Sequence, residues 1–296
     1  MTETSGFATD ARAGRLVQPV SVLAAHVLCD ATEVQDRYAG DVGDFLKLGL
    51  LRYLTSPHAG LPPLRLGVVW YRVEDEVHNA DGKYVAYLSR ASAVGRSLRS
   101  LDPDLYDRLS GVVHSGTRSV AALESAGVLP MESPCFAEAL GFGHLPPSAK
   151  TRRVAWRNDW LSRALVATKD CDLVFVDPDN GVRRSDHGVP SHRSKTEKHA
   201  YFDELGQFTG RAQSLVAYHH ADRSTTVERQ AQLRLADAAH ELQIEPLAAV
   251  RASRGTNRLF LVLPVEAHRS NLEAHLKRLE RSAWSSELKV YWWASD

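Results

Sequence analysis

Apolar runs alternate with amphipathic segments along most of this chain. Six runs are mostly apolar and suit strands that are buried on both faces, at 64–71, 151–156, 171–177, 213–220, 257–264 and 287–293. Between or before them, apolar residues recur at helical spacing in 37–54, 159–167 and 225–243. This alternation predicts a Rossmann-like α/β fold, with a mostly parallel sheet that is covered by helices on both faces.

The same pattern predicts how the chain is organised. Residues 1–35 mix small and polar residues and are expected to form an N-terminal tail, whereas 36–296 are expected to form a single domain. The segment at about 85–150 has the pattern of helices and turns, with Asp102 as a helix cap, and is predicted to be a helical insertion.

Composition narrows the class of protein. The chain has 296 residues, 44% of them hydrophobic and 24% charged, which is typical of a globular protein and excludes a wholly disordered one. Its 36 basic and 36 acidic residues argue against a protein that coats polyanions, although a local basic patch is compatible with this balance. No apolar run reaches the roughly 18 residues of a membrane span, so no membrane partner is expected.

The N-terminal residues and the cysteines indicate the cellular compartment of the protein. The first residues lack the basic-then-apolar order of a secretion signal. The three cysteines form no C-x-x-C pair, and their odd number leaves one over in any disulfide scheme. We therefore expect a cytoplasmic protein.

The strongest chemical signal follows the apolar run at 171–177. That run leads into Asp177-Pro178-Asp179-Asn180-Gly181. Ligands of open α/β sheets bind beyond the carboxyl ends of the strands, so we predict Asp177, Asp179 and Asn180 as catalytic residues. The alternative is a proline-containing turn with solvated acids.

Two other predicted strands also end in polar residues. The run at 213–220 ends in His219 and His220, which point to opposite faces of a strand, so at most one faces the site; we take His219 as the substrate-binding candidate. The loop at 72–84 follows the first strand and is either a binding loop or a solvated one. Its candidates are His78, Asp81 and Gly82.

The first predicted helix begins with charged residues. Asp41 and Asp44 favour a helix N-terminus through the macrodipole. Lys47 lies three residues beyond Asp44 in an otherwise apolar stretch, so a salt bridge and a ligand contact are both open.

Two basic sets suit phosphate positioning or base stacking, although surface charge is the commoner explanation. The segment 192–205 contributes Lys195, Lys198 and Tyr201, and 251–258 contributes Arg254, as substrate-binding candidates.

The order of these motifs resembles that of the bacterial methyltransferases that modify the N6 position of adenine in large-subunit ribosomal RNA (the RlmJ-type family). The resemblance covers roughly 37–220. It is carried by short motifs, which are Tyr38-Ala39-Gly40 with Asp44 and Lys47, then His78, Gly82 and Tyr84, then Asn158-Asp159, and finally Asp177-Pro178.

The resemblance implies a fold that binds S-adenosylmethionine and a site in which Asp177 orients the target amine. The cofactor-binding residues that it implies are Tyr38, Asp44, Lys47, His78, Asp81, Gly82 and Asp159. The chain departs from the family in three places. No obvious short strand ends in an acid for the cofactor ribose, for which Glu132 and Glu138 are poor candidates. One glycine remains in the glycine-rich loop, and the D-P-P-Y motif has become Asp177-Pro178-Asp179-Asn180, without the aromatic that stacks a flipped adenine.

Three functions follow as hypotheses. The leading one is a methyltransferase-like enzyme that acts on a nucleic acid or nucleotide-like substrate with S-adenosylmethionine as donor. The second is a metal-dependent phosphodiesterase or nuclease that binds Mg²⁺ or Mn²⁺. Its ligands would be Asp41, Asp44, Asp177, Asp179 and His219. The third is a binding module with a degenerate cofactor pocket. Substrate identity and oligomeric state are not predicted.

Overall fold

The computed structural model describes residues 39–58, 60–73, 84–130, 132–184, 193 and 196–294. These residues belong to one compact unit, Thr32–Asp296. The tail predicted at 1–35 lies outside the described residues.

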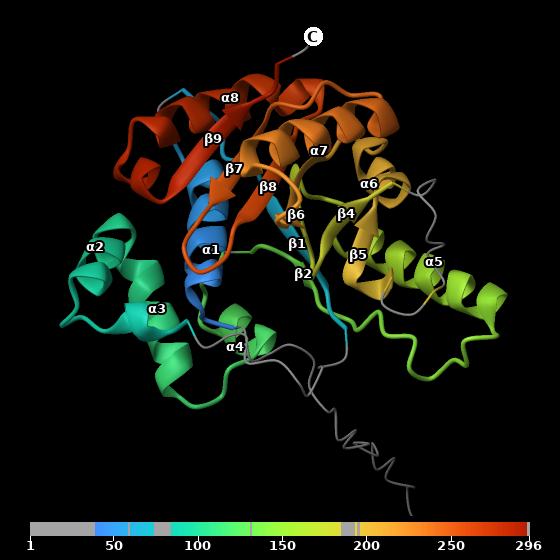
Figure 1. Cartoon of the computed structure of the whole chain (residues 1–296), viewed down its shortest axis with the longest axis horizontal. Coiled ribbons are helices and arrows are strands. Elements are labelled where there is room, and N and C mark those ends of the chain that lie inside the picture. Colours follow the sequence, from blue (N-terminus) through green and yellow to red (C-terminus); the bar gives the residue numbers. More distant parts are fainter. Residues whose placement is uncertain are drawn as a thin grey trace, which may run out of the picture. The chain divides into compact units, whose positions relative to one another are not determined.

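A seven-stranded sheet runs through the described part of the chain, in the order β2-β1-β3-β6-β8-β7-β9 (Figure 1). Its strands are β1 Leu66–Tyr71, β2 Cys135–Phe136, β3 Leu173–Pro178, β6 Ser214–His220, β7 Ala248–Ala252, β8 Arg258–Leu263 and β9 Leu288–Trp292. The pairings from β2 to β6 are parallel, and those of β8 with β6 and of β7 with β8 and β9 are antiparallel. The predicted Rossmann-like α/β class is confirmed, with an antiparallel extension on one side of the parallel strands.

Helices cover both faces of this sheet. The first face packs against α1 Val42–Thr55, α8 Glu266–Glu280 and the helices of the insertion, and the second against α5 Lys150–Ala167, α6 Phe202–Thr209 and α7 Val227–Leu242. Successive strand residues alternate between the two cores, as Leu173 and Phe175 against Val174 and Val176 show. Both cores are continuous apolar clusters, so the sheet is buried from either side.

The first strand-like run after the insertion, 151–156, is not a strand. It is the beginning of α5, in which Arg153, Arg157, Trp160, Leu161 and Ala164 form the buried stripe. These residues recur at helical spacing, but the first two of them are arginines. A pattern based on apolar residues alone therefore misses the beginning of the stripe. The prediction of a strand there was wrong because the guanidinium groups are buried with carbonyl and carboxylate partners, such as Leu145 and Glu204.

The segment between β1 and β2 contains the predicted helices. They are the 3₁₀ helix η2 Ala86–Leu88 and the α-helices α2 Ala93–Leu101, α3 Pro103–His114 and α4 Val120–Ser125. Asp102 caps α3 as predicted, by accepting from Leu105 N at 2.9 Å. The two-residue strand β2 that follows α4 was not predicted, because so short a run leaves no periodicity to detect.

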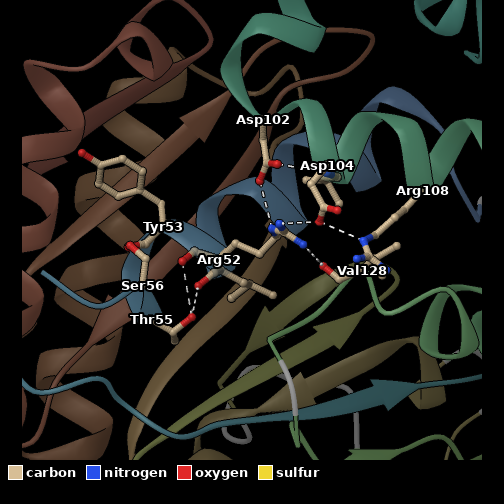
Figure 2. A network of polar contacts seen from close by, with 10 residues as sticks. Arg52, Tyr53, Thr55, Ser56, Asp102, Asp104, Arg108 and Val128 are labelled. Carbon is tan, nitrogen blue, oxygen red and sulfur yellow. Dashed lines mark hydrogen bonds and ion pairs between the residues drawn. The ribbon is translucent and has the colours of Figure 1, made fainter.

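Arg52, at the end of α1, fastens this segment to that helix (Figure 2). Its Nε is 2.9 Å from the Asp102 carboxylate and its Nη2 is 2.9 Å from that of Asp104. Its Nη1 donates to the carbonyl of Val128 at 3.3 Å. One side chain thus joins α1, α3 and the turn after α4.

Smaller elements complete the described residues. They are the parallel pair β4 Gly181–Arg183 and β5 His199–Tyr201 and the 3₁₀ helices η3 Thr196–Lys198 and η4 Ala283–Ser286. A search of the described residues finds no helix with the length and hydropathy of a membrane span.

Candidate functional site

The carboxyl ends of β1 and β3 are a topological switch point. From β1 the chain passes through the insertion, on the α1 face, to β2 on one side of β1. From β3 it passes through α6, on the other face, to β6 on the opposite side. Because adjacent strands lead away in opposite directions, their carboxyl ends leave the crevice in which α/β proteins bind ligands.

Asp177 lies at this switch point, and a lysine from the first helix holds it. Asp177 is in register with Trp70 at the end of β1. Lys47 Nζ is 2.7 Å from Asp177 Oδ2 and 2.7 Å from Asp44 Oδ1. The same ammonium lies over the Trp70 ring, 4.8 Å from its centroid. The structure thus brings together Asp44, Lys47 and Asp177, which the sequence separates by up to 133 positions.

Burial and charge act against each other in this cluster. Burial alone lowers the pKa of Lys47, but the carboxylates of Asp177 and Asp44 outweigh it and raise the pKa above the ordinary lysine value. Burial raises the pKa of Asp177, and Lys47 opposes that shift only in part. Lys47 is therefore a permanent cation near neutral pH, and Asp177 takes up a proton more readily than an exposed aspartate.

The N-terminus of α1 is built from the same acids. Asp41 is the N-cap and accepts from Asp44 N at 2.9 Å, while Asp44 Oδ2 accepts from Gly40 N at 2.8 Å. Gly40 has φ +82°, a left-handed conformation that favours glycine. Burial and the neighbouring Asp44 raise the pKa of Asp41, and Arg258, 3.6 Å away, opposes this. Both aspartates thus have a structural task at the helix start in addition to lining the site.

The predicted catalytic segment after Asp177 is tied to the segment before β5. Asp179 Oδ2 forms an ion pair of 3.1 Å with Lys198 Nζ, and Asn180 N donates to the Lys198 carbonyl at 2.8 Å. Lys198, a predicted substrate-binding residue, therefore lies beside the predicted catalytic residues. Its ammonium is already engaged with a carboxylate.

His219 lies on the other face of the sheet from Lys47. Its Nδ1 accepts from Val182 N at 3.3 Å, and Gly181, with φ +95°, packs so closely that a Cβ would come within 2.5 Å of that nitrogen. Burial lowers the pKa of His219 to about 3 and that of the neighbouring His199 to about 4, and nearby arginines add to both shifts. His219 therefore contacts the backbone of β4, just after Asn180, as a neutral acceptor.

Three residues that the sequence analysis did not select also line the region. They are Trp70, Tyr218 and Arg258. Tyr218 is a residue of β6 that faces the α1 side, and burial raises the pKa of its phenol despite Arg258. Tyr218 directly precedes His219, and successive residues of a strand point to opposite faces. This alternation could have indicated from the sequence that Tyr218 faces the site if His219 does not.

The remaining predicted residues lie elsewhere or outside the description. Asp159 is on the exposed side of α5 and pairs with Arg163, Tyr201 is buried at 2% exposure, and Arg254 pairs with Glu287. Tyr38, His78, Asp81, Gly82 and Lys195 lie outside the described residues.

The donor set of the metal-dependent alternative does not come together. Among the described residues, no group of three or more His, Cys, Asp and Glu side chains is placed to hold a metal ion. The Lys47 ammonium stands between Asp44 and Asp177, and His219 is on the opposite face. These residues therefore do not fit a bound Mg²⁺ or Mn²⁺.

Comparison with known proteins does not assign this chain to a family. No protein-family model, no curated protein and no solved structure matches this chain.

Proposed function

We propose that this chain is a methyltransferase-like enzyme that uses S-adenosylmethionine and acts on a nucleic acid or nucleotide-like substrate. One observation carries the proposal. The Asp177 carboxylate is delivered by β3 to the switch point of the sheet and is fixed there by Lys47. The motif order that resembles adenine methyltransferases supports the choice of cofactor and substrate class.

The charges around Asp177 fit the cofactor. Four carboxylates and three cations form ion pairs around Asp177, which gives a formal excess of one negative charge. The charged residues are Asp41, Asp44, Asp177 and Asp179 with Lys47, Lys198 and Arg258. S-adenosylmethionine carries a sulfonium, an ammonium and a carboxylate, a net charge of plus one, which a group of side chains with an excess of negative charge attracts. The residues that would hold it are Asp44 and Lys47 at the start of α1.

When bound, the cofactor supplies an electrophilic methyl group, and the protein's share of the work is orientation. Asp177 would accept a hydrogen bond from an N–H of the target amine, which orients the nitrogen lone pair. Its raised pKa suits it to take up the proton that the amine loses when it is methylated. Lys47 prevents the carboxylate from turning away, and the Asn180 side chain supplies a further polar contact. Holding donor and acceptor in line accounts for a large part of the barrier reduction in such transfers.

The cofactor is tested by isothermal titration of S-adenosylmethionine into the wild type, Lys47→Met and the matched control Lys277→Met. Lys277 is an exposed lysine of α8, so its removal leaves the site intact. We expect wild type and Lys277→Met to bind alike and Lys47→Met to bind at least about tenfold more weakly. The reason is that the Asp44 and Asp177 carboxylates lose the ammonium that fixes their geometry. Absence of binding to the wild type at millimolar cofactor refutes the proposal.

The catalytic role is tested by transfer of a labelled methyl group to RNA, DNA and free nucleotides. Asp177→Asn is expected to lower the rate by about 100-fold or more. Asp170→Asn is the matched control, because this exposed aspartate precedes the opposite end of the same strand. Equal rates for the two variants contradict the role of Asp177.

A further inference from the structure

A buried arginine on α5 lies beneath the catalytic segment and has no part in the chemistry described above. Arg157 is 2% exposed. Its Nε and Nη2 form a two-pronged contact with the Glu204 carboxylate, in which Nη2 is 2.9 Å from Oε2. Its guanidinium also lies over the Tyr201 ring, 5.0 Å from the centroid. The charge is thus fully paired, as burial requires.

The two remaining donor contacts of Arg157 bracket Lys198. Nη1 donates to the carbonyl of Thr196 at 3.1 Å, and Nη2 donates to that of His199 at 2.6 Å. These carbonyls stand two residues before and one residue after Lys198. The backbone that carries Lys198 is therefore held at both sides by one guanidinium.

Lys198 in turn reaches the catalytic segment by two contacts. Its ammonium pairs with Asp179, and its carbonyl accepts from the amide of Asn180. A continuous set of contacts therefore leads from α5 through Lys198 to both residues that follow Pro178.

An arginine suits this task better than any other side chain. A planar guanidinium donates to one carboxylate and two carbonyls at fixed angles, whereas a lysine ammonium has no such fork. Glu204 is itself fixed, because its Oε2 accepts from Tyr201 N at 3.0 Å.

We propose that Arg157 is a positioning residue that holds Lys198 against Asp179 and so fixes the catalytic segment from below. The placement of Lys198 follows from contacts alone, and only its effect on methyl transfer rests on the proposed function.

The placement is tested without any substrate by acylating the lysines of the folded protein and measuring each site by mass spectrometry. We compare wild type, Arg157→Lys, Glu204→Gln and Asp179→Asn, with the exposed Lys277 as the internal standard. In Arg157→Lys, acylation of Lys198 relative to Lys277 is expected to rise about fivefold, the scale of one ion pair, and to approach its level in Asp179→Asn. Lys47 is expected to stay protected.

Two outcomes overturn the proposal. One is unchanged protection of Lys198 in Arg157→Lys; the other is an equal rise at Lys47 and Lys198, which means that the whole fold has loosened. If Arg157→Lys does not fold, Glu204→Gln takes its place, because it weakens the ion pair that holds Arg157. Acylation of Lys198 and of Lys47 is then measured and judged in the same way.

The catalytic consequence is tested by a double-mutant cycle with Lys198→Met. If Arg157 acts through Lys198, the loss of activity in Arg157→Lys disappears in the Lys198→Met background, whereas additive losses contradict the proposal. A rise in Lys198 acylation in a protein that neither binds S-adenosylmethionine nor transfers methyl groups leaves the positioning role standing and refutes the proposed function.

Discussion

Lys47 and Asp177 show how a contact at the residue scale acquires meaning only in the folded chain. The sequence placed Lys47 within reach of Asp44 and left a salt bridge and a ligand contact open. The structure makes the salt bridge and adds Asp177 to it at 2.7 Å. The lysine is thereby a link between the first helix and the end of β3, and its removal exposes two buried carboxylates to each other.

Two buried histidines beside β4, His199 and His219, make stability depend on pH. An unfolded histidine takes up a proton near pH 6.5, whereas His219 in the folded protein does so only at about pH 3. Its contribution to the free energy of unfolding is complete above pH 6.5 and is lost as the pH falls toward 3, since only the unfolded state then gains the proton.

We expect the loss of unfolding free energy between pH 7 and pH 5 to be smaller in His219→Asn than in the wild type, by about 1–2 kcal/mol. Asparagine retains an acceptor for Val182 N, so the contact itself is preserved. The measurement is urea denaturation at the two pH values. His240→Asn, at an exposed histidine of α7, is the control and should reproduce the wild-type loss; an identical loss in all three proteins contradicts the assignment.

At the scale of the element, α1 is shaped by what packs against its glycines. A Cβ at Gly49 would come within 2.1 Å of the Trp284 ring, and that ring is buried and stacked on Phe45 at 5.5 Å. In α3, by contrast, Gly111 has no atom within 4 Å of a Cβ. In the sequence, Gly49 and Gly111 are both glycines within helical segments, and only their neighbours in the fold distinguish them.

We therefore expect opposite effects from one substitution. Gly49→Ala should lower the free energy of unfolding by about 1–3 kcal/mol through overpacking, whereas Gly111→Ala should raise it by up to about 1 kcal/mol through helix propensity. Chemical denaturation of both variants checks this. A stabilising Gly49→Ala would show that Trp284 moves aside freely.

A second prediction at this scale concerns Arg52, which fastens the insertion to α1 (Figure 2). Arg52→Ala removes contacts to Asp102, Asp104 and Val128. We expect a loss of about 1–2 kcal/mol in the free energy of unfolding and faster amide exchange in α3. Arg108→Ala, which removes a more exposed partner of Asp104, should have the smaller effect; the reverse order would contradict the role of Arg52.

At the scale of the whole molecule, the site arises from connectivity. Residues of α1, β1, β3 and β6 converge because the chain leaves β1 and β3 in opposite directions. The antiparallel strand β8 then brings Arg258 to the N-terminus of α1, where it faces Asp41. No local pattern predicts this convergence, since it depends on strand order.

The sequence by itself determined the α/β class, five of the six strands that were predicted, the cap of α3, and the acids at the start of α1 and at the end of β3. Periodicity and capping are local, so they can be read along the chain. Where the pattern failed, as at 151–156, buried arginines replaced apolar residues in a helical stripe whose partners lie far away in the sequence. Only the tertiary structure decided that Lys47 meets Asp177 and that Tyr218 rather than His219 faces that pair. It also decided that Arg157 binds the carbonyls on either side of Lys198. Each of these depends on which strands are neighbours and which face a residue takes, and long-range packing alone fixes both.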